Sequence, residues 1–289
     1  MQDRKIYQTT ETELRESVTP VFIAGLPGKM ATLVTEALVQ DENYHLLERG
    51  LSSKRHNREP INAGQTTVGL IDYCPFDLPR GTIAVDYTTP QSAALNAVDY
   101  ASLKIPFVMG TSGGDREMLA QTVRDSKICA VIAANMDPQI VGWQMKIDEM
   151  AQNNPGIFEG TTVGILEIHQ PTKRDTSGTA LAFRAQFEKY GALPDGRITS
   201  VRDNPDSAIV INALGYDVDP QQGYAYHLVT VTGVSGRIVS EFETRVVGRR
   251  PYVEGTLMAI KFLEGQMRAG AKGQVFTMTD VLRGGDINA

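Results

Sequence analysis

The sequence is poor in cysteine and has no excess of positive charge, and each shortage excludes a class of protein. Only two cysteines occur in 289 residues, Cys74 and Cys129, so we expect no disulfide framework. The 28 lysines and arginines are outnumbered by 34 aspartates and glutamates, which gives a net charge of −6 at pH 7. Because a nucleic-acid surface normally needs a basic face, we expect no nucleic-acid partner, although this balance allows a local basic pocket.

Long apolar runs are also missing. No stretch is long enough to cross a bilayer, so we expect no membrane partner. The N-terminal residues MQDRKIYQTTETELRES are polar and partly acidic, and they fit neither a secretory signal nor a transit peptide. We therefore expect a cytoplasmic location. No cluster of histidine, cysteine or carboxylate has the sequence spacing of metal ligands, so no metal is expected.

The first half of the chain alternates short β-rich runs with helical patterns. The expected strands are 21–24, 44–52, 66–74, 82–87, 106–109 and 128–133. The expected helices are 30–38, 92–103 and 117–124. Strands that alternate with helices usually pair in parallel, so this half predicts an α/β fold with a doubly wound, Rossmann-like parallel sheet.

The second half differs because its β-rich segments follow one another. A helix at 141–151, a strand at 161–169 and a helix at 179–190 come first. Three β-rich segments with turn residues between them and one more helix then follow. These are 198–202, 224–231, 237–246 and the helix 255–268. The pattern predicts a second α+β domain built on a mixed open sheet, and 276–282 is expected to return to the first domain.

The segment VFIAGLPGKMATLV, residues 21–34, combines a strand, a glycine turn and a helix. Gly25 allows a sharp turn, and Gly28 allows the backbone to approach a pyrophosphate that the helix-start N–H groups would face. Ala31 takes the place of a third small residue, and the G-x-x-G-x-x-A spacing is looser than the usual dinucleotide fingerprint. An ordinary βα turn is the alternative, and the alternating strand–helix context favours the dinucleotide site.

The end of the second expected strand predicts which nucleotide binds. A site that prefers NAD usually has an acidic residue there to bind the ribose hydroxyls. The run at 50–55 instead contains Ser52, Ser53, Lys54 and Arg55, whose hydroxyls and cations suit a 2′-phosphate. NADPH is therefore expected, and NADH is possible because Glu48 precedes the run. A solvated turn is the alternative interpretation.

The segment EIHQPTKRDTSGTAL, residues 167–181, concentrates polar groups between a strand and a helix. Glu167 and His169 share one face of the strand because side chains alternate with period two. Lys173 follows in a loop, and the N–H groups of Gly178 and Thr179 at the helix start would form an anion site. A proton donor, a cation and a carboxylate site would serve to bind an anionic substrate and protonate it as hydride arrives. An ordinary capped helix with a surface histidine and lysine is the alternative.

This segment resembles the signature of the dihydrodipicolinate reductase family, which is close to E-x-H-H-x-x-K-x-D-x-P-S-G-T-A. Further similar blocks occur in the family's order along nearly the whole chain. They are G-x-x-G-K-M at 25–30, VDYTTP at 85–90, FVMGTSGGDRE at 107–117, AANM at 133–136, GR with Y-x-E-G-T at 248–256, and TDVLRGG at 279–285. The GTSGGDRE and DTSGTA forms look most similar to the plant-type branch.

The resemblance implies an NAD(P)H-dependent oxidoreductase of the lysine/diaminopimelate pathway that reduces 4-hydroxy-tetrahydrodipicolinate (dihydrodipicolinate) to tetrahydrodipicolinate. It implies His169 as the catalytic proton donor and Lys173 as the catalytic lysine that contacts the substrate. The substrate-binding residues it implies are Ser177, Gly178, Thr179 and, by a weaker match, Arg249. The cofactor-binding residues it implies are Gly25, Gly28, Lys29, Met30, Thr88, Gly110, Thr111 and Asn135.

The family plan also implies a domain division and an assembly. Residues 1–135 and 250–289 would form the dinucleotide-binding domain, and 136–249 the substrate-binding and oligomerisation domain of a homo-oligomer, either a tetramer or a dimer. The sequence departs from the family signature at four places. Gln170 replaces a histidine, as in the plant-type branch, the proline before Ser177 is absent, Ala31 replaces a glycine, and Tyr224 replaces a histidine while His227 is retained.

Two other functions fit parts of the sequence. One is a different NAD(P)H-dependent two-domain dehydrogenase, and the other is a non-catalytic nucleotide-binding sensor. Retention of both His169 and Lys173 argues against the sensor, because a protein that only binds a nucleotide needs no proton donor.

Overall fold

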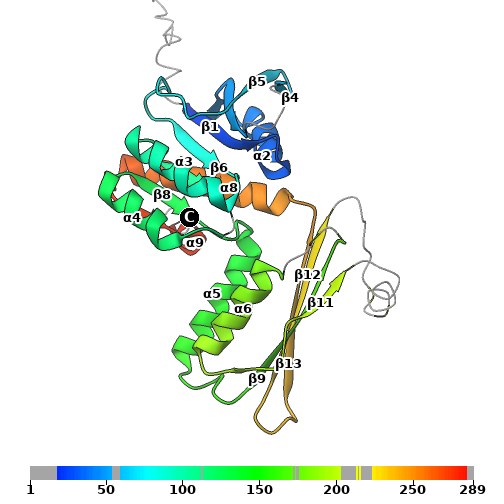
Figure 1. Ribbon diagram of the computed structural model, residues 1–289. Coiled ribbons are helices and arrows are strands. Elements are labelled where there is room, and N and C mark those ends of the chain that lie inside the picture. The colour runs from blue at the N-terminus through cyan, green and yellow to red at the C-terminus, as the bar shows by residue number, and fades with distance from the viewer. Residues whose placement is uncertain are drawn as a thin grey trace, which may run out of the picture. The chain divides into compact units, whose positions relative to one another are not determined.

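The computed structural model describes residues 18–53, 59–111, 113–171, 173, 176–202, 213, 215 and 223–284. The chain divides into two compact units (Figure 1). The first contains the described residues up to Ala133 and the segment Thr256–Thr277, and the second contains Ala134–Gly255 and the helix that begins at Met278. None of the helices in the described part of the chain is long and apolar enough to span a membrane.

The first unit is built on a mostly parallel sheet. Its strands are β1 (Thr19–Leu26), β2 (Tyr44–Leu46), β3 (Arg49–Ser52), β4 (Ile61–Ala63), β5 (Thr66–Ile71), β6 (Ile83–Asp86), β7 (Phe107–Met109), β8 (Cys129–Ile132) and β14 (Gln274–Phe276). Their order is β14-β8-β7-β6-β1-β3-β5-β4, with β2 also paired to β1. All of these pairs are parallel except β4 with β5. Strand order reverses between β1 and β6, which is where ligands bind in doubly wound sheets.

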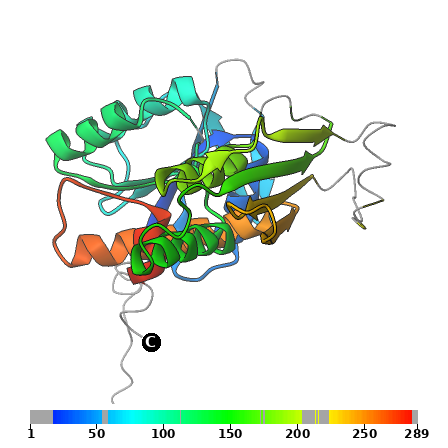
Figure 2. The same ribbon diagram turned by 90° about the horizontal axis from the view of Figure 1, so that it is seen from below.

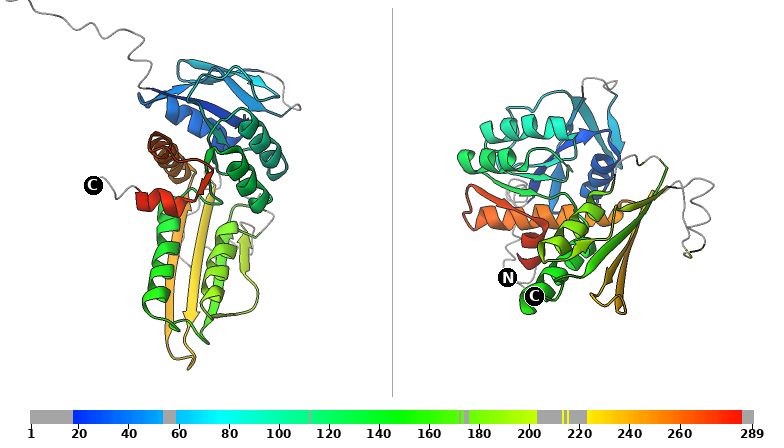
Figure 3. Two further views of the ribbon diagram at one scale, coloured as in Figure 1. Left: turned by 90° about the vertical axis from the view of Figure 1, so that its left-hand side faces the viewer. Right: turned by 60° about the horizontal axis from the view of Figure 1, so that its bottom comes forward.

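Helices cover both faces of this sheet. They are α2 (Lys29–Val39), α3 (Pro90–Ser102), α4 (Arg116–Ser126) and α8 (Arg250–Arg268), of which α8 begins in the second unit. Figure 3 shows α3 and α4 on one side of the strands and α8 on the other. Phe22, Tyr100 and Phe107 are fully buried in the core beneath α3 and α4. Burial on both faces explains why β6, β7 and β8 are apolar almost throughout.

The strand expected at 44–52 is two short strands. Both β2 and β3 pair in parallel with β1, one with each half of it. The chain steps between them at Leu47, whose N–H donates to the carbonyl of Val21. The short strand β4, which the sequence pattern did not indicate, forms a hairpin with β5 through a turn that contains Gly64 at a φ of +58°.

The second unit contains a mixed sheet with two helices on one face. Its strands are β9 (Thr162–His169), β10 (Leu193–Pro194), β11 (Thr199–Arg202), β12 (Tyr224–Thr232) and β13 (Val239–Val247). Its helices are α5 (Pro138–Asn153), α6 (Gly178–Lys189) and the short α9 (Met278–Gly284). Strand β9 pairs in parallel with β11 and antiparallel with β12, which pairs antiparallel with β13. The expected combination of a Rossmann-like parallel sheet with a second unit on a mixed sheet is confirmed.

Strand register in the second unit places polar residues in one row across the sheet. Glu167 on β9 lies opposite Ser200 on β11 and His227 on β12, and His227 lies opposite Thr244 on β13. The row shares the sheet face with Val163, which packs in one core with residues of α5 and α6. The ribbons of these two helices beside the sheet are drawn in Figures 1 and 2. The polar row is therefore buried at one end of an otherwise apolar core.

Two glycines of helix α8 provide a matched test of the packing. A Cβ on Gly255 would lie 1.6 Å from the carbonyl oxygen of Met136, whereas a Cβ on Gly265 would meet nothing within 4 Å. We expect Gly255→Ala to lower the free energy of unfolding by about 1–3 kcal/mol because the backbone must shift. Gly265→Ala should raise it by up to about 1 kcal/mol through helix propensity. Denaturant unfolding measures both, and equal effects would contradict the close approach at Gly255.

Candidate active site

The predicted phosphate turn lies at the carboxyl end of β1, beside the end of β6. Gly25 has a φ of +107°, and a Cβ there would lie 2.6 Å from the carbonyl oxygen of Tyr87. A Cβ on Gly28 would lie 2.7 Å from the carbonyl oxygen of Gly25. Gly25 is therefore required for its positive φ, and at both positions a side chain would collide with a carbonyl oxygen.

Helix α2 starts at this turn without a side-chain cap. Its N-cap residue Gly28 makes no side-chain hydrogen bond, and no acidic residue occurs in its first turn. Helices α3 to α6 each begin with a side chain that accepts from the first turn; these caps are Thr89, Asp115, Asp137 and Ser177. Lys29 and Met30 are the first two residues of α2. The N–H groups at this helix start thus suit the phosphates of a dinucleotide.

A buried carboxylate organises the carboxyl end of β6. Asp86 is fully buried, and its oxygens accept hydrogen bonds from the N–H and hydroxyl of Thr88 at 2.8 and 2.6 Å and from the Asn96 amide at 2.8 Å. The hydroxyl of Thr111 donates to the Thr88 carbonyl at 3.0 Å. A Cβ on Gly110 would overlap the ring of Tyr87. Thr88, Gly110 and Thr111, all predicted to line the nicotinamide, therefore lie together at the ends of β6 and β7.

The other predicted cofactor residues are more dispersed. Ser52 ends β3, and its buried hydroxyl has no hydrogen-bond partner among the described residues. Ser53 follows it, while Lys54 and Arg55 lie outside the described residues. Asn135 belongs to the second unit, where its amide donates to the hydroxyl of Thr179 at 3.1 Å.

In the second unit, Glu167 is the first residue of the predicted substrate segment 167–181. It is fully buried and accepts hydrogen bonds from the Ser177 N–H at 2.7 Å, the Ser200 hydroxyl at 2.6 Å and the Arg202 guanidinium at 2.8 Å. Burial by itself raises the pKa of Glu167. The hydrogen bonds from Ser200, Arg202 and the main chain outweigh burial and hold this pKa below its ordinary value, so the carboxylate is ionised.

His169 ends strand β9 with one ring nitrogen free for chemistry. Its Nδ1 lies 3.1 Å from the carbonyl oxygen of Tyr224, which can only accept, so Nδ1 carries the hydrogen in the neutral ring. Its Nε2 lies 3.8 Å from Glu167 Oε2 and has no hydrogen-bond partner among the described residues. Burial lowers the pKa of His169 from 6.5 to about 4, aided by the positive charges of Arg202 and Lys173. At neutral pH, His169 is therefore uncharged with a bare Nε2.

A second buried histidine, His227, packs edge-on against His169 with ring centres 5.3 Å apart. Its Nε2 lies 2.9 Å from the hydroxyl of Ser177, which itself accepts from the Thr179 N–H at 3.2 Å. The Ser177 hydroxyl is therefore shared between the Thr179 N–H and His227 Nε2. Burial, followed by the neighbouring His169, lowers the pKa of His227 to about 4. His227 was noted in the sequence only as a retained residue and was assigned no role, because only the strand register brings it to this site.

The start of helix α6 offers an anion site smaller than the sequence predicted. The N–H and hydroxyl of Ser177 are both engaged internally, and the Thr179 N–H donates to that hydroxyl, which leaves the N–H of Gly178 among these residues at the first turn. A Cβ on Gly178 would meet nothing within 4 Å, so the space in front of it is open. Lys173 lies near enough for its charge to act on both histidines. Arg249 lies at the bend after β13, with its guanidinium beside Gly223.

Glu167, His169 and His227 bring three potential metal-ligand atoms within 4.8 Å of one another. Spacing along the chain did not reveal this group, because two strands contribute to it. The Glu167 oxygens already accept three hydrogen bonds, and the Arg202 guanidinium balances their charge. This internal pairing disfavours a dication at the group, and the absence of a metal stays a prediction.

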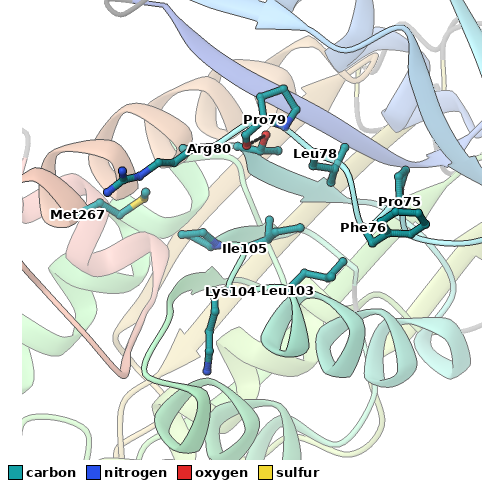
Figure 4. A pocket seen from close by; sticks show the side chains of 12 residues that line it. Pro75, Phe76, Leu78, Pro79, Arg80, Leu103, Lys104, Ile105 and Met267 are labelled. Carbon is teal, nitrogen blue, oxygen red and sulfur yellow. Dashed lines mark hydrogen bonds between the residues drawn. The ribbon is translucent and has the colours of Figure 1, made fainter.

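Figure 4 shows a cavity of about 340 Å³ in the first unit, with the side chains of Phe76, Arg80 and Lys104 around it. Its wall includes Thr82 and Pro106, which directly precede β6 and β7. The cavity therefore lies at the amino ends of these strands, whereas the predicted nicotinamide residues lie at their carboxyl ends. None of the predicted site residues lines it.

Two family models match nearly the whole chain. "Dihydrodipicolinate reductase, N-terminus" matches residues 19–136, and "Dihydrodipicolinate reductase, C-terminus" matches residues 142–282. The chloroplastic 4-hydroxy-tetrahydrodipicolinate reductase 1 of Arabidopsis thaliana is 38% identical over 276 residues, 92% of this chain and 78% of that protein. The 4-hydroxy-tetrahydrodipicolinate reductase of Methanopyrus kandleri is 28% identical over 92% of this chain and 97% of its own length. The predicted resemblance to plant-type members is confirmed.

Among solved structures, the chain is similar to a dipicolinate-bound dihydrodipicolinate reductase from Paenisporosarcina sp. TG-14. The TM-score is 0.58 at 17% sequence identity, and the match covers 90% of this chain and 97% of that one. This likeness supports the fold.

The two buried histidines predict a loss of stability in mild acid. Both have a pKa of about 4 in the folded protein against 6.5 when exposed, so the unfolded chain binds more protons between these values. The contribution of the two histidines to the free energy of unfolding is therefore fully present above pH 6.5. It falls as the pH drops from 6.5 towards 4, by up to about 1.4 kcal/mol per pH unit for each histidine.

His227→Gln should reduce this pH dependence by about half, because one of two equivalent groups is removed. Denaturant unfolding at several pH values between 6.5 and 4 measures the slope. His45→Gln, at an exposed position on β2, is the matched control and should leave the slope unchanged. A slope that is the same in His227→Gln and in the wild type would contradict the burial of a neutral ring.

Proposed function

Because this chain belongs to the dihydrodipicolinate reductase family, we propose that it reduces 4-hydroxy-tetrahydrodipicolinate to tetrahydrodipicolinate in the lysine/diaminopimelate pathway. The substrate loses water and gains a hydride and a proton. The observation that carries the proposal is the bare Nε2 of the buried His169, held in the same unit as the open helix start at Gly178. One group can move a proton and the other can hold a carboxylate.

The second unit supplies the chemistry that a dicarboxylate requires. One carboxylate accepts from the N–H of Gly178, at the positive end of the helix dipole, and lies beside Ser177 and Thr179. The ammonium of Lys173 neutralises charge on or near the ring. Dipicolinate, named as bound in the related structure, is a flat dicarboxylate of this class. Arg249 is proposed as a further substrate contact by its place in the family pattern.

His169 manages the proton through Nε2. The ring is neutral before substrate binds because burial lowers its pKa to about 4. The negative charge of a bound dicarboxylate raises that pKa, and Glu167 at 3.8 Å stabilises the protonated ring. His169 then protonates the substrate as the ring is reduced. A bound nicotinamide supplies the hydride, and the chain's own residues orient the substrate and hold the proton.

We propose that the first unit binds the dinucleotide and that the second binds the substrate. The uncapped start of α2 suits the pyrophosphate, and Thr88, Gly110 and Thr111 suit the nicotinamide end. NADPH is the proposed preference, since the unpartnered hydroxyl of Ser52 precedes Ser53, Lys54 and Arg55. NADH remains a possible second donor because the first unit suits both dinucleotides.

The second unit is also proposed to form the interface of a homo-oligomer, either a tetramer or a dimer. Helices α5 and α6 cover one face of its sheet, while Leu166, Leu228 and the exposed Val247 belong to the other face of the described strands.

The relatives in plants are named as chloroplastic, and the cytoplasmic location stays a prediction from the N-terminal residues.

The proposed function is tested by supplying the product of dihydrodipicolinate synthase and following the absorbance of NADPH, and of NADH in parallel. We expect turnover with both nucleotides and a higher kcat/KM with NADPH. Lys173→Ala should lower kcat/KM by about a hundredfold or more, because charge stabilisation in the transition state is lost. Lys146→Ala, an exposed lysine of α5, is the control and should behave as the wild type. Absence of turnover with either nucleotide would refute the proposal.

The anion site at the start of α6 is tested by Gly178→Ala. The added methyl group meets no protein atom, so stability should hold, but it enters the space proposed for a carboxylate. We expect the Kd of pyridine-2,6-dicarboxylate to rise by about tenfold or more, the loss of roughly one charge-assisted hydrogen bond. Calorimetric titration in the presence of NADPH measures it. Gly142→Ala, at an open position of α5, is the control, and equal affinities of the two variants would place the carboxylate elsewhere.

A further inference from the structure

Glu167, at the start of the substrate segment, forms a largely buried ion pair with Arg202 of β11. Their closest atoms, Glu167 Oε1 and Arg202 Nη2, are 2.8 Å apart, and the two side chains are 0% and 18% exposed. Both residues lie on paired strands, because β11 runs parallel to β9 with Arg202 opposite His169. The pair thus belongs to the rigid sheet and not to the connection that follows β9.

Each partner of the pair holds one point of that connection. Glu167 Oε2 accepts from the Ser177 N–H at 2.7 Å, directly before helix α6. Arg202 Nε donates to the carbonyl of Lys173 at 2.9 Å. Both proposed substrate groups, the lysine and the helix start, are therefore tied to one ion pair by main-chain hydrogen bonds.

The geometry of the guanidinium makes this double contact possible. Arg202 reaches the Lys173 carbonyl through Nε, Glu167 through Nη2 and the carbonyl of Val201 through Nη1 at 3.0 Å. Its planar fork has several donors in fixed directions, whereas a lysine ammonium has one compact centre. The Ser200 hydroxyl donates a further hydrogen bond to the Glu167 carboxylate at 2.6 Å.

We propose that Glu167 and Arg202 are positioning residues that set the distance between Lys173 and the Gly178 N–H at the start of α6, and so fix which dicarboxylate the site accepts. This inference rests on the proposed function of the second unit. Neither residue touches the substrate. They act through the main chain of the residues that do, because the Lys173 ammonium and the N–H donor at the start of α6 must meet the two carboxylates of the substrate at a fixed separation.

The test compares Arg202→Lys with Arg184→Lys. Arg202→Lys keeps the charge but cannot make both the Glu167 and the Lys173 contacts. Arg184→Lys alters the i,i+4 pair with Glu188 on the surface of α6 and is the matched control. Calorimetry measures the Kd of pyridine-2,6-dicarboxylate and, separately, of NADPH. We expect Arg202→Lys to raise the dicarboxylate Kd by about tenfold or more and to leave the NADPH Kd unchanged, while the control changes neither.

Steady-state kinetics separates positioning from a general loss of structure. In Arg202→Lys, kcat/KM should fall by up to about a hundredfold, as expected for misplaced binding groups, while the variant stays folded and binds NADPH as the wild type does. Glu167→Asp, which keeps the charge and shortens the reach to Ser177, should give the same pattern. Dicarboxylate affinity and kcat/KM equal to those of the wild type in Arg202→Lys would overturn the inference, as would an equal loss of NADPH affinity.

Amide hydrogen exchange reports the same contacts without any ligand. We expect faster exchange in the peptide that covers 170–181 in Arg202→Lys and no change in Arg184→Lys. If the wild-type protein binds the dicarboxylate but shows no turnover, the proposed reaction is refuted. The dicarboxylate Kd values of Arg202→Lys and Arg184→Lys then test the inference. If the wild type binds no dicarboxylate, the proposed substrate fails. Amide hydrogen exchange then tests whether the ion pair holds the segment, and unchanged exchange in Arg202→Lys overturns the inference.

Discussion

The buried carboxylate of Glu167 is the constraint on which the second unit depends. An ionised group in an apolar core is tolerated only when hydrogen bonds and an opposite charge replace water. This requirement is met by hydrogen bonds from Ser200 and Arg202 of β11 and from the Ser177 N–H at the start of α6. The same bonds that stabilise the charge therefore also fix the helix start and the main chain at Lys173.

The first unit solves a similar problem in a different way. Asp86 is fully buried at the end of β6, and the donors that surround its carboxylate are neutral: Thr88, Asn96 and Tyr100. These contacts hold the loop after β6 next to the loop after β7, where Thr111 donates to Thr88. In both units a buried carboxylate lies at or near the carboxyl end of a strand, and the loop that follows the strand contains predicted ligand-binding residues.

Much of the fold could be predicted because its signals are local. Alternating strands and helices indicated the parallel sheet, and Gly25 and Gly28 indicated the turn between β1 and α2, where the structure leaves no room for a Cβ. The division of 44–52 into β2 and β3 was missed, because it depends on how the segment pairs with β1 and not on its own residues. His169, Lys173 and the start of α6 were found for the same local reason, since one short segment contains them all.

Neither the pairing register nor burial can be read from the chain by itself. Ser200 and His227 lie 33 and 60 positions after Glu167 in the sequence, and only the register of β11 and β12 places them beside it. The sequence determined that a proton carrier, a cation and a helix start would follow one strand, because periodicity and capping act over a few residues. The tertiary structure alone decided that His169 is neutral, that Ser177 is engaged internally and that Arg202 holds the segment, because solvent exclusion and hydrogen-bond partners depend on strands that are distant in the chain.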